Sequence, residues 1–257
     1  MNKIDELAQV LADSKNIVFF GGAGVSTASG IPDFRSADGL YSEKLGGKFT
    51  PEQLVSHSFF VNHPEEFFEF YKDKLVYPDA LPNACHIALA ELEKMGKLSA
   101  VVTQNIDGLH QKAGSKNVFE LHGSVLRNYC TSCGEFYDEN YVLESEGIPR
   151  CKKDGSIIKP DVVLYEEALD TGVLSGAINA ISKADTLIIG GTSLVVYPAA
   201  GLIEYFHGKN LILINKSHTP ADRSATLVIH ENIAEVMDEA VAEMKKILAK
   251  DDEEKKD

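Results

Sequence analysis

The sequence predicts an α/β fold in which a Rossmann-like parallel sheet is joined by crossover helices. Short apolar runs rich in Val, Ile and Leu alternate along the chain with stretches of helical character, which is the pattern of βα units. The runs cover residues 16–20, 98–103, 117–121, 185–190, 210–215 and 225–229. Two insertions interrupt this alternation. Residues 38–79 are rich in Phe and Glu at helical spacing, and residues 127–159 hold three of the four cysteines.

The composition is that of a chain with a full hydrophobic core. The 257 residues are 44% hydrophobic, so one large domain or two unequal domains are expected. The formal net charge of −14 disfavours general nucleic-acid binding, because phosphate contacts need clustered Lys and Arg, and it suits basic, lysine-bearing substrates weakly. The charged tail, residues 250–257, is expected to fray.

The N-terminal segment predicts an amphipathic helix. Ile4, Leu7, Val10 and Leu11 recur at helical spacing among charged residues, without the apolar core of a signal peptide. No apolar run in the sequence is long enough to span a bilayer. We therefore expect a cytoplasmic protein that does not enter a membrane.

A glycine-rich turn follows the first predicted strand. Residues 17–20 are β-branched or aromatic, and Gly21, Gly22 and Gly24 then let the backbone turn and approach a ligand. A helix starting there would attract phosphate through its N-terminal amides, although many α/β proteins with such a turn bind nothing. Thr27 stands where the usual dinucleotide fingerprint has its third glycine, and no strand ends in an acid about twenty residues on. An ordinary nicotinamide dehydrogenase is therefore disfavoured.

Polar residues cluster again after the second strand-like run, in residues 103–110. Asn105 and Asp107 are two apart, so in extended backbone an amide and a carboxylate point the same way toward one small polar group. The other interpretation is a turn with capped polar groups. A third short strand is followed by His122, whose ordinary pKa of about 6.5 suits a base, although a lone histidine there is more often structural.

The cysteines form an incomplete zinc motif. Cys130 and Cys133 make one pair, and Cys151 follows after a 17-residue gap with Asp154 in the position of a fourth cysteine. Two interpretations stay open: a structural zinc ion bound with Asp154 or water as fourth ligand, or a metal-free module held by packing. Cys85 lies among apolar residues of a predicted helix and is expected to be a buried thiol.

The motifs together resemble the sirtuin family. In the family's order, the chain contains GAGVSTASGIPDFRS, TQNIDGLH, ELHGS, the cysteine pairs and GGTSLVVYPA, and the resemblance runs from about Ile17 to Ile233. It implies an NAD-dependent protein lysine deacylase, here a deacetylase, that moves the acyl group to ADP-ribose and releases nicotinamide and O-acetyl-ADP-ribose. The alternatives are a protein ADP-ribosyltransferase and a catalytically idle NAD-binding module.

The resemblance also implies a domain organisation. The two insertions are expected to fold together as a smaller domain, a helical module plus a zinc-ribbon-like module, leaving a cleft beside the sheet. The Rossmann-like NAD-binding domain would comprise residues 1–37, 80–126 and 160–249, and the small domain residues 38–79 and 127–159.

Roles follow for individual residues. His122 resembles the family's general base, and Asn105 and Asp107 resemble the pair that holds the nicotinamide carboxamide. Phe34 would shield the reacting sugar from water and Arg35 would meet phosphate or ribose; otherwise Phe34 fills a core and Arg35 is solvated. The expected cofactor-binding set is Gly22, Ala23, Gly24, Ser26, Thr27, Asp33, Phe34, Arg35, Gln104, Asn105, Ile106, Asp107, His122, Gly191, Thr192, Ser193, Asn215, Asn232 and Ile233.

The expected substrate segment departs from the family pattern. It consists of Val162, Val163, Leu164, Tyr165 and Glu166, and would pair with a substrate backbone by β-augmentation. Where relatives commonly have Phe-Gly-Glu, this chain has Tyr-Glu-Glu, and Lys159 replaces the usual arginine. A glutamate in place of the glycine would narrow the groove or attract basic peptides.

The acyl preference is predicted from a second departure. Relatives that remove succinyl groups carry Tyr-x-x-Arg in the small domain, where this chain has Tyr71 and Lys74. Lysine cannot bind a carboxylate in bidentate fashion, so acetyl-lysine is the expected substrate.

Overall fold

A six-stranded parallel sheet forms the centre of the larger part of the molecule. The computed structural model describes residues 2–34 and 49–254. The sheet has the order β3-β2-β1-β7-β8-β9, and every neighbouring pair is parallel. Its strands are β1 (Ile17–Gly21), β2 (Leu98–Thr103), β3 (Val118–Glu120), β7 (Thr186–Gly190), β8 (Asn210–Ile214) and β9 (Leu227–Ile229). The six predicted runs match these strands to within two residues, and the order is that of a Rossmann fold, which confirms the predicted fold class.

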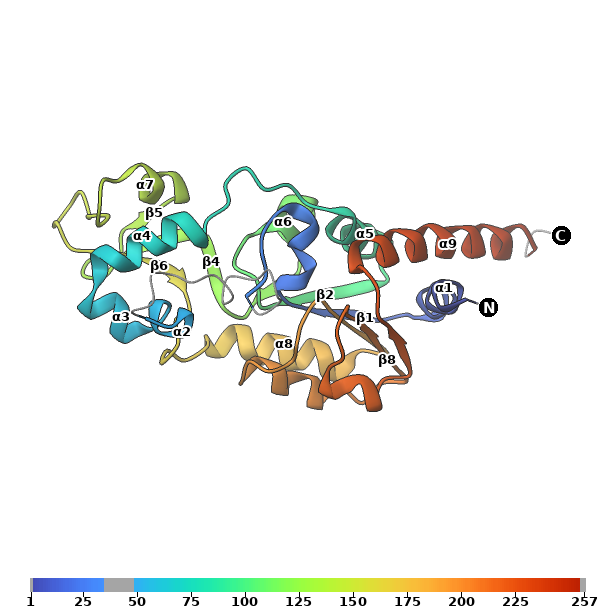
Figure 1. The fold of residues 1–257 in the computed structure, drawn as a ribbon. Helices are drawn as coiled ribbons and strands as arrows, with labels where there is room; N and C mark the ends of the chain where they lie inside the picture. The colour runs from blue at the N-terminus through green and yellow to red at the C-terminus, as the bar shows by residue number, and fades with distance from the viewer. Residues whose placement is uncertain (1, 35–48, 255–257) are drawn as a thin grey trace.

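Helices cover both faces of this sheet (Figure 1). On one face lie α1 (Lys3–Asp13), α5 (Ala84–Lys94) and α9 (Ile233–Glu254), and on the other lie α8 (Thr171–Lys183) and the 3₁₀ helix η4 (Ala199–Tyr205). A short helix, α6 (Leu109–Ala113), follows β2. Within the described part of the chain, no helix is long and apolar enough to cross a membrane.

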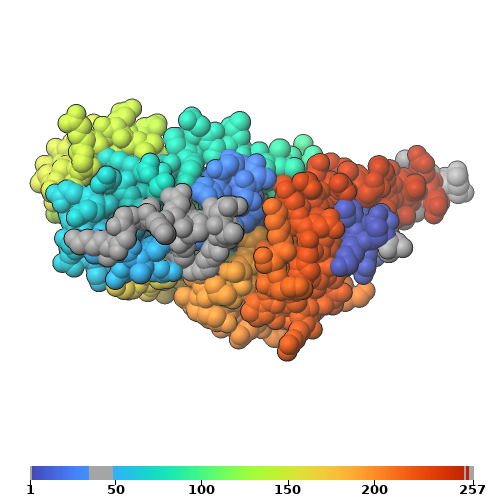
Figure 2. Space-filling model, in the orientation of Figure 1, coloured from blue at the N-terminus to red at the C-terminus, as the bar shows by residue number. Residues whose placement is uncertain are grey.

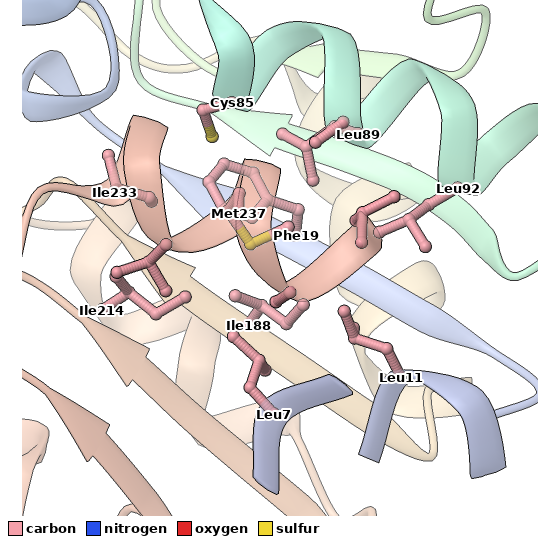
Figure 3. Close-up of a cluster of buried hydrophobic side chains, with 14 of the residues drawn as sticks. Leu7, Leu11, Phe19, Cys85, Leu89, Leu92, Ile188, Ile214, Ile233 and Met237 are labelled. Carbon is pink, nitrogen blue, oxygen red and sulfur yellow. The ribbon is translucent and has the colours of Figure 1, made fainter. Parts of the chain in front are cut away.

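The two cores follow from the alternation of side chains along the strands. Phe19 packs into the cluster under α1, α5 and α9, and Phe20 packs into the cluster against α8. Figure 3 shows the first cluster, in which Leu7 and Leu11 of α1 meet Met237 of α9. Cys85 is fully buried in the same cluster, as predicted.

The C-terminal tail differs from the prediction. Residues 250–257 are expected to fray, but residues 250–254 continue α9, because a solvated helix tolerates charged residues. Residues 255–257 lie outside the described part of the chain. The N-terminal helix agrees with its predicted pattern and is capped by Asn2, whose side chain accepts a hydrogen bond from the Asp5 amide.

The two insertions pack against each other. The first forms α2 (Pro51–Leu54), α3 (His57–Asn62) and α4 (Pro64–Lys74). The second contributes α7 (Glu139–Glu144) and a three-stranded antiparallel sheet of β4 (Gly123–Cys130), β5 (Phe136–Tyr137) and β6 (Ile158–Val162). Phe67 and Phe68 of α4 share one core with Val142 and Ile158. Figure 2 shows these insertions at one end of the molecule, opposite the end of α9.

The exact domain boundaries stay a prediction. β4 runs across the expected boundary at residues 126 and 127, and β6 runs across the one at residues 159 and 160. Both strands therefore connect the large sheet to the cysteine module by continuous backbone. Arg35 and residues 38–48 of the first insertion lie outside the described residues.

Candidate active site

A cleft of about 1000 Å³ lies at the carboxyl ends of the central strands. It includes the position between β1 and β7, where the direction of strand order reverses and where open α/β sheets bind ligands. Arg35 lies outside the described residues, but the other expected cofactor residues line this one cleft: Gly22, Ala23, Gly24, Ser26, Thr27, Asp33, Phe34, Gln104, Asn105, Ile106, Asp107, His122, Gly191, Thr192, Ser193, Asn215, Asn232 and Ile233.

The glycine-rich turn has a different structure from the one expected. No α-helix starts there; instead two 3₁₀ helices follow, η1 (Ala23–Val25) and η2 (Thr27–Ser29). The turn is fixed by close backbone contact, since the Gly24 amide donates to the Gly191 carbonyl at 2.8 Å. A Cβ atom on Gly24 would lie 2.8 Å from the Gly191 Cα atom, so glycine is required for this approach. The helix that follows the turn is therefore of the 3₁₀ type, and a phosphate site at this turn stays a prediction.

Asn105 and Asp107 point the same way, toward Ser26. The Ser26 hydroxyl donates to Asp107 Oδ2 at 2.6 Å and accepts from Asn105 Nδ2 at 3.1 Å. The second Asp107 oxygen accepts from the Leu109 amide at 2.9 Å. The amide and the carboxylate are thus held in fixed positions at one end of the cleft.

His122 is fixed at the junction of the two sheets. Its Nδ1 lies 2.9 Å from the Gln104 carbonyl, so Nδ1 carries the hydrogen and the neutral ring keeps its lone pair on Nε2. Its own carbonyl accepts from the Val163 amide at 3.0 Å. Burial lowers the pKa of His122, and the hydrogen bond to Gln104 opposes this effect in part. A lowered pKa keeps the ring neutral, which is the form that accepts a proton.

Other expected cofactor residues already have partners within the protein. Gln104 Nε2 donates to Thr192 Oγ1 at 3.0 Å and joins the ends of β2 and β7. Asn215 Nδ2 donates to the Ser217 carbonyl at 2.7 Å. Asn232 accepts from the Ala234 amide at the start of α9, and Ile233 is largely buried in the core. Phe34 both lines the cleft and packs against the core of the insertions, so its two interpretations are not exclusive.

The expected substrate segment lines the cleft and is anchored to the helical insertion. The Tyr165 amide donates to the Val55 carbonyl, and the Tyr165 carbonyl accepts from the His57 amide, each at 3.0 Å. Glu166 has a φ of 77°, a left-handed conformation that suits glycine. Its carboxylate accepts from the amide and the hydroxyl of Ser58, at 2.8 and 2.5 Å. Glu166 thus has a left-handed backbone of the kind that glycine favours, and its charge is bound to Ser58.

Lys159 and Glu167 hold the end of this segment. Glu167 Oε2 accepts from Lys159 Nζ at 3.1 Å and from the Leu164 amide at 3.0 Å. Glu167 Oε1 lies 2.8 Å from His57 Nδ1. Lys159 therefore ties β6 to the residues that follow it.

The cysteine module has the geometry of a metal site. One ligand atom each from Cys130, Cys133, Cys151 and Asp154 lies within 4.8 Å of the others. The Cys133 and Cys151 sulfurs are 3.6 Å apart, close to the value of about 3.8 Å expected across a tetrahedral zinc site with 2.3 Å bonds. Backbone amides of Ser132 and Cys133 both donate to the Cys130 sulfur. These residues fit a structural zinc ion with Asp154 as fourth ligand.

Several residues that line the cleft were not predicted. They include Tyr77 after the end of α4, and Lys216 after β8. The position of Lys216, directly after the strand that ends near Asn215, was a usable signal, because strand ends gather at this edge. Tyr77 had no such signal in the sequence.

The fold and the cleft define a Rossmann-type α/β protein with a second, metal-module-bearing part beside its ligand site. A family model described as Sir2 family matches residues 22–198. The chain is 70% identical over 241 residues to the "NAD-dependent protein deacetylase" of Clostridium perfringens (strain 13 / Type A). This match covers 93% of this chain and 99% of that protein. The chain belongs to the Sir2 family.

Solved structures are similar over nearly the whole chain. A crystal structure of a Sir2 homolog–NAD complex is 39% identical, with a TM-score of 0.84, covering 95% of this chain and 94% of that one. A structure of Sir2 with a deacetylated p53 peptide and 3'-O-acetyl ADP ribose is 40% identical, with a TM-score of 0.86, covering 94% and 98%.

Proposed function

We infer that this protein is an NAD-dependent protein lysine deacetylase. The observation that carries this conclusion is the convergence of His122, the Asn105–Asp107 pair and the glycine turn on one cleft. The cleft also contains the segment 162–166, which is suited to bind an extended peptide. NAD supplies the ADP-ribose that accepts the acetyl group, one water is consumed, and the products are the free lysine side chain, nicotinamide and O-acetyl-ADP-ribose.

We propose distinct roles for the polar residues of the cleft. Asn105 and Asp107, held by Ser26, bind the nicotinamide carboxamide. His122 takes a proton from a ribose hydroxyl at Nε2, because its Nδ1 already donates to Gln104. Asn215 and Thr192 contribute hydrogen-bonding groups farther along the cleft, where ribose would bind. Phe34 excludes water from the reacting end.

We propose that acetyl-lysine is preferred over succinyl-lysine. The Tyr71 side chain is buried among Phe67 and Phe68, and its hydroxyl has no hydrogen-bond partner in the described part of the chain. A tyrosine in this position is unsuited to bind an acyl carboxylate in the cleft. Turnover of one peptide in acetylated and succinylated form tests this preference, and faster turnover of the succinylated form would refute it.

The cysteine module is proposed to hold zinc in a structural role, distant from the acetyl transfer. The partners are proteins or peptides that carry acetyl-lysine. We propose a cytoplasmic location, which is supported by four cysteines that are free of disulfide bonds.

One reaction tests the proposed function. The protein is incubated with NAD and an acetyl-lysine peptide, and the products are analysed by mass spectrometry. The proposal expects deacetylated peptide, nicotinamide and O-acetyl-ADP-ribose. An ADP-ribosylated protein would instead indicate a transferase, and bound but unconsumed NAD would indicate an idle module.

A further inference from the structure

A second group of metal-ligating side chains lies beyond the ends of β8 and β9, apart from the cysteine module. His218, Asp222 and His230 each place one ligand atom within 4.8 Å of the others. Asp222 Oδ2 lies 2.6 Å from His218 Nδ1 and 3.2 Å from His230 Nε2. Two imidazole nitrogens thus point at the same carboxylate oxygen.

Hydrogen bonds to the backbone fix two of these three side chains. His230 Nδ1 lies 2.8 Å from the Asn215 carbonyl, so Nδ1 carries a hydrogen and Nε2 faces Asp222. Asp222 Oδ1 accepts from the amide and the hydroxyl of Thr219, at 2.8 and 2.9 Å, which leaves Oδ2 facing the rings. A histidine that donates its other ring hydrogen to a carbonyl, beside an oriented carboxylate, is the usual arrangement around a bound metal.

The spacing of these atoms fits a metal ion bound between them. His230 Nε2 and Asp222 Oδ2 are 3.2 Å apart. Ligand atoms of a tetrahedral site with bonds of about 2.0 Å are about 3.3 Å apart, which agrees with this distance. The shorter His218 contact must widen, and the His218 side chain, 86% exposed, has the space to rotate.

We propose that His218, Asp222 and His230 bind one divalent cation of the class that prefers imidazole ligands, such as Zn²⁺, Co²⁺ or Ni²⁺. Water completes the coordination, because the cluster is open to solvent at His218. The ion would join the residues after β8 to those after β9. It would also hold the ring that donates to Asn215, a residue that lines the cleft.

Zinc binding by the full-length protein tests the proposal without NAD or substrate. Equilibrium dialysis near neutral pH gives the number of Zn²⁺ ions bound per chain. We expect His218→Ala and Asp222→Asn each to bind one ion fewer than the unmodified chain, whether or not the cysteine module is also filled. Asp222→Asn keeps an oxygen for Thr219, and His207→Ala, a change at another exposed histidine, is the matched control and should bind the full number.

Co²⁺ absorbance distinguishes the two metal sites. Cysteine ligands give a thiolate-to-cobalt charge-transfer band, and a site of histidine and aspartate does not. His218→Ala should therefore bind less Co²⁺ than the unmodified chain but show the same thiolate band. Equal zinc content in the unmodified chain and both variants would overturn the proposal, leaving a proton-bridged cluster. An equal loss in the His207→Ala control, or a loss of the thiolate band, would also overturn it.

Discussion

At the scale of single residues, the candidate site is held in place by its own hydrogen bonds. Ser26 bridges Asn105 and Asp107, and Gln104 orients His122 through its carbonyl. Such contacts fix the direction of each side chain in the protein itself, which reduces the ordering needed when a ligand binds.

The pH dependence of turnover tests the role of His122. Because burial lowers its pKa, the ring stays unprotonated below its ordinary value of about 6.5. We expect the acid limb of kcat/KM against pH to fall below this value, and His122→Ala to lose about 10²- to 10⁴-fold in turnover while NAD still binds. An acid limb that is unchanged in a still active His122→Ala variant would show that another group is the base.

Some residue-level features could be predicted from the sequence and others could not. Asn105, Asp107 and His122 were identified as candidates because they are polar residues placed directly after predicted strands. The resemblance implied that Glu166 stands where relatives commonly have glycine, but the expectation of a narrowed or charged groove did not include Ser58, which is 108 positions away and binds the carboxylate. Contacts between distant segments leave no local pattern in a sequence.

At the scale of elements, the junction between β3 and β4 positions His122. Gly123 has a φ of 74°, and a Cβ atom there would lie 1.9 Å from the Asp161 carbonyl oxygen. A side chain at this position would therefore push β6 away from β4, next to the candidate base. The predicted strands were found because their apolar runs are local, whereas this constraint arises from pairing between two strands.

Replacement of Gly123 tests this constraint. Gly123→Ala should lower the free energy of unfolding, measured in urea, because it combines a left-handed backbone with a steric clash. Gly96→Ala is the matched control, since Gly96 has a φ of 73° and open space around its Cβ position. We expect the free energy of unfolding to fall by about 1 kcal/mol in Gly96→Ala and by about 2 kcal/mol or more in Gly123→Ala. Equal losses would argue against the clash.

The fourth ligand of the cysteine module gives a second test at this scale. Asp154→Cys should tighten zinc binding, because a thiolate is a softer ligand than a carboxylate, and Asp154→Ala should weaken it. Competition with a chelator, followed by the thiolate charge-transfer band of Co²⁺, measures this module separately from the histidine cluster. Identical affinities in all three proteins would exclude Asp154 as a ligand.

At the scale of the whole molecule, two buried histidines connect α5 and α6 beneath the site. The rings of His86 and His110 are 4.7 Å apart, and both side chains are almost fully buried. His86 Nδ1 accepts from the Asn83 amide, but the remaining ring nitrogens have no hydrogen-bond partner in the described part of the chain. Burial lowers the pKa of His86 to about 4 and that of His110 to about 3.

The stability of the fold should therefore fall in acid. Below a pH of about 6.5 the unfolded chain binds protons at these positions and the folded chain does not, so stability is complete above this value and is lost as the pH falls toward the folded pKa values. By pH 5 the loss is about 2 kcal/mol for each histidine. Urea unfolding above pH 6.5 and at pH 5 measures this loss of unfolding free energy, which should be smaller in His110→Leu than in the unmodified chain. An unchanged pH dependence in that variant would contradict the account.

Amide hydrogen exchange with and without NAD tests the central claim most directly, that the glycine turn, the Asn105–Asp107 pair and His122 surround one NAD molecule. We expect NAD to slow exchange together in residues 22–27, 104–107 and 191–193, with the same concentration dependence in each segment. The distant module around Cys133 serves as the internal reference and should not change. Protection confined to one of these segments, or different concentration dependences among them, would contradict the account.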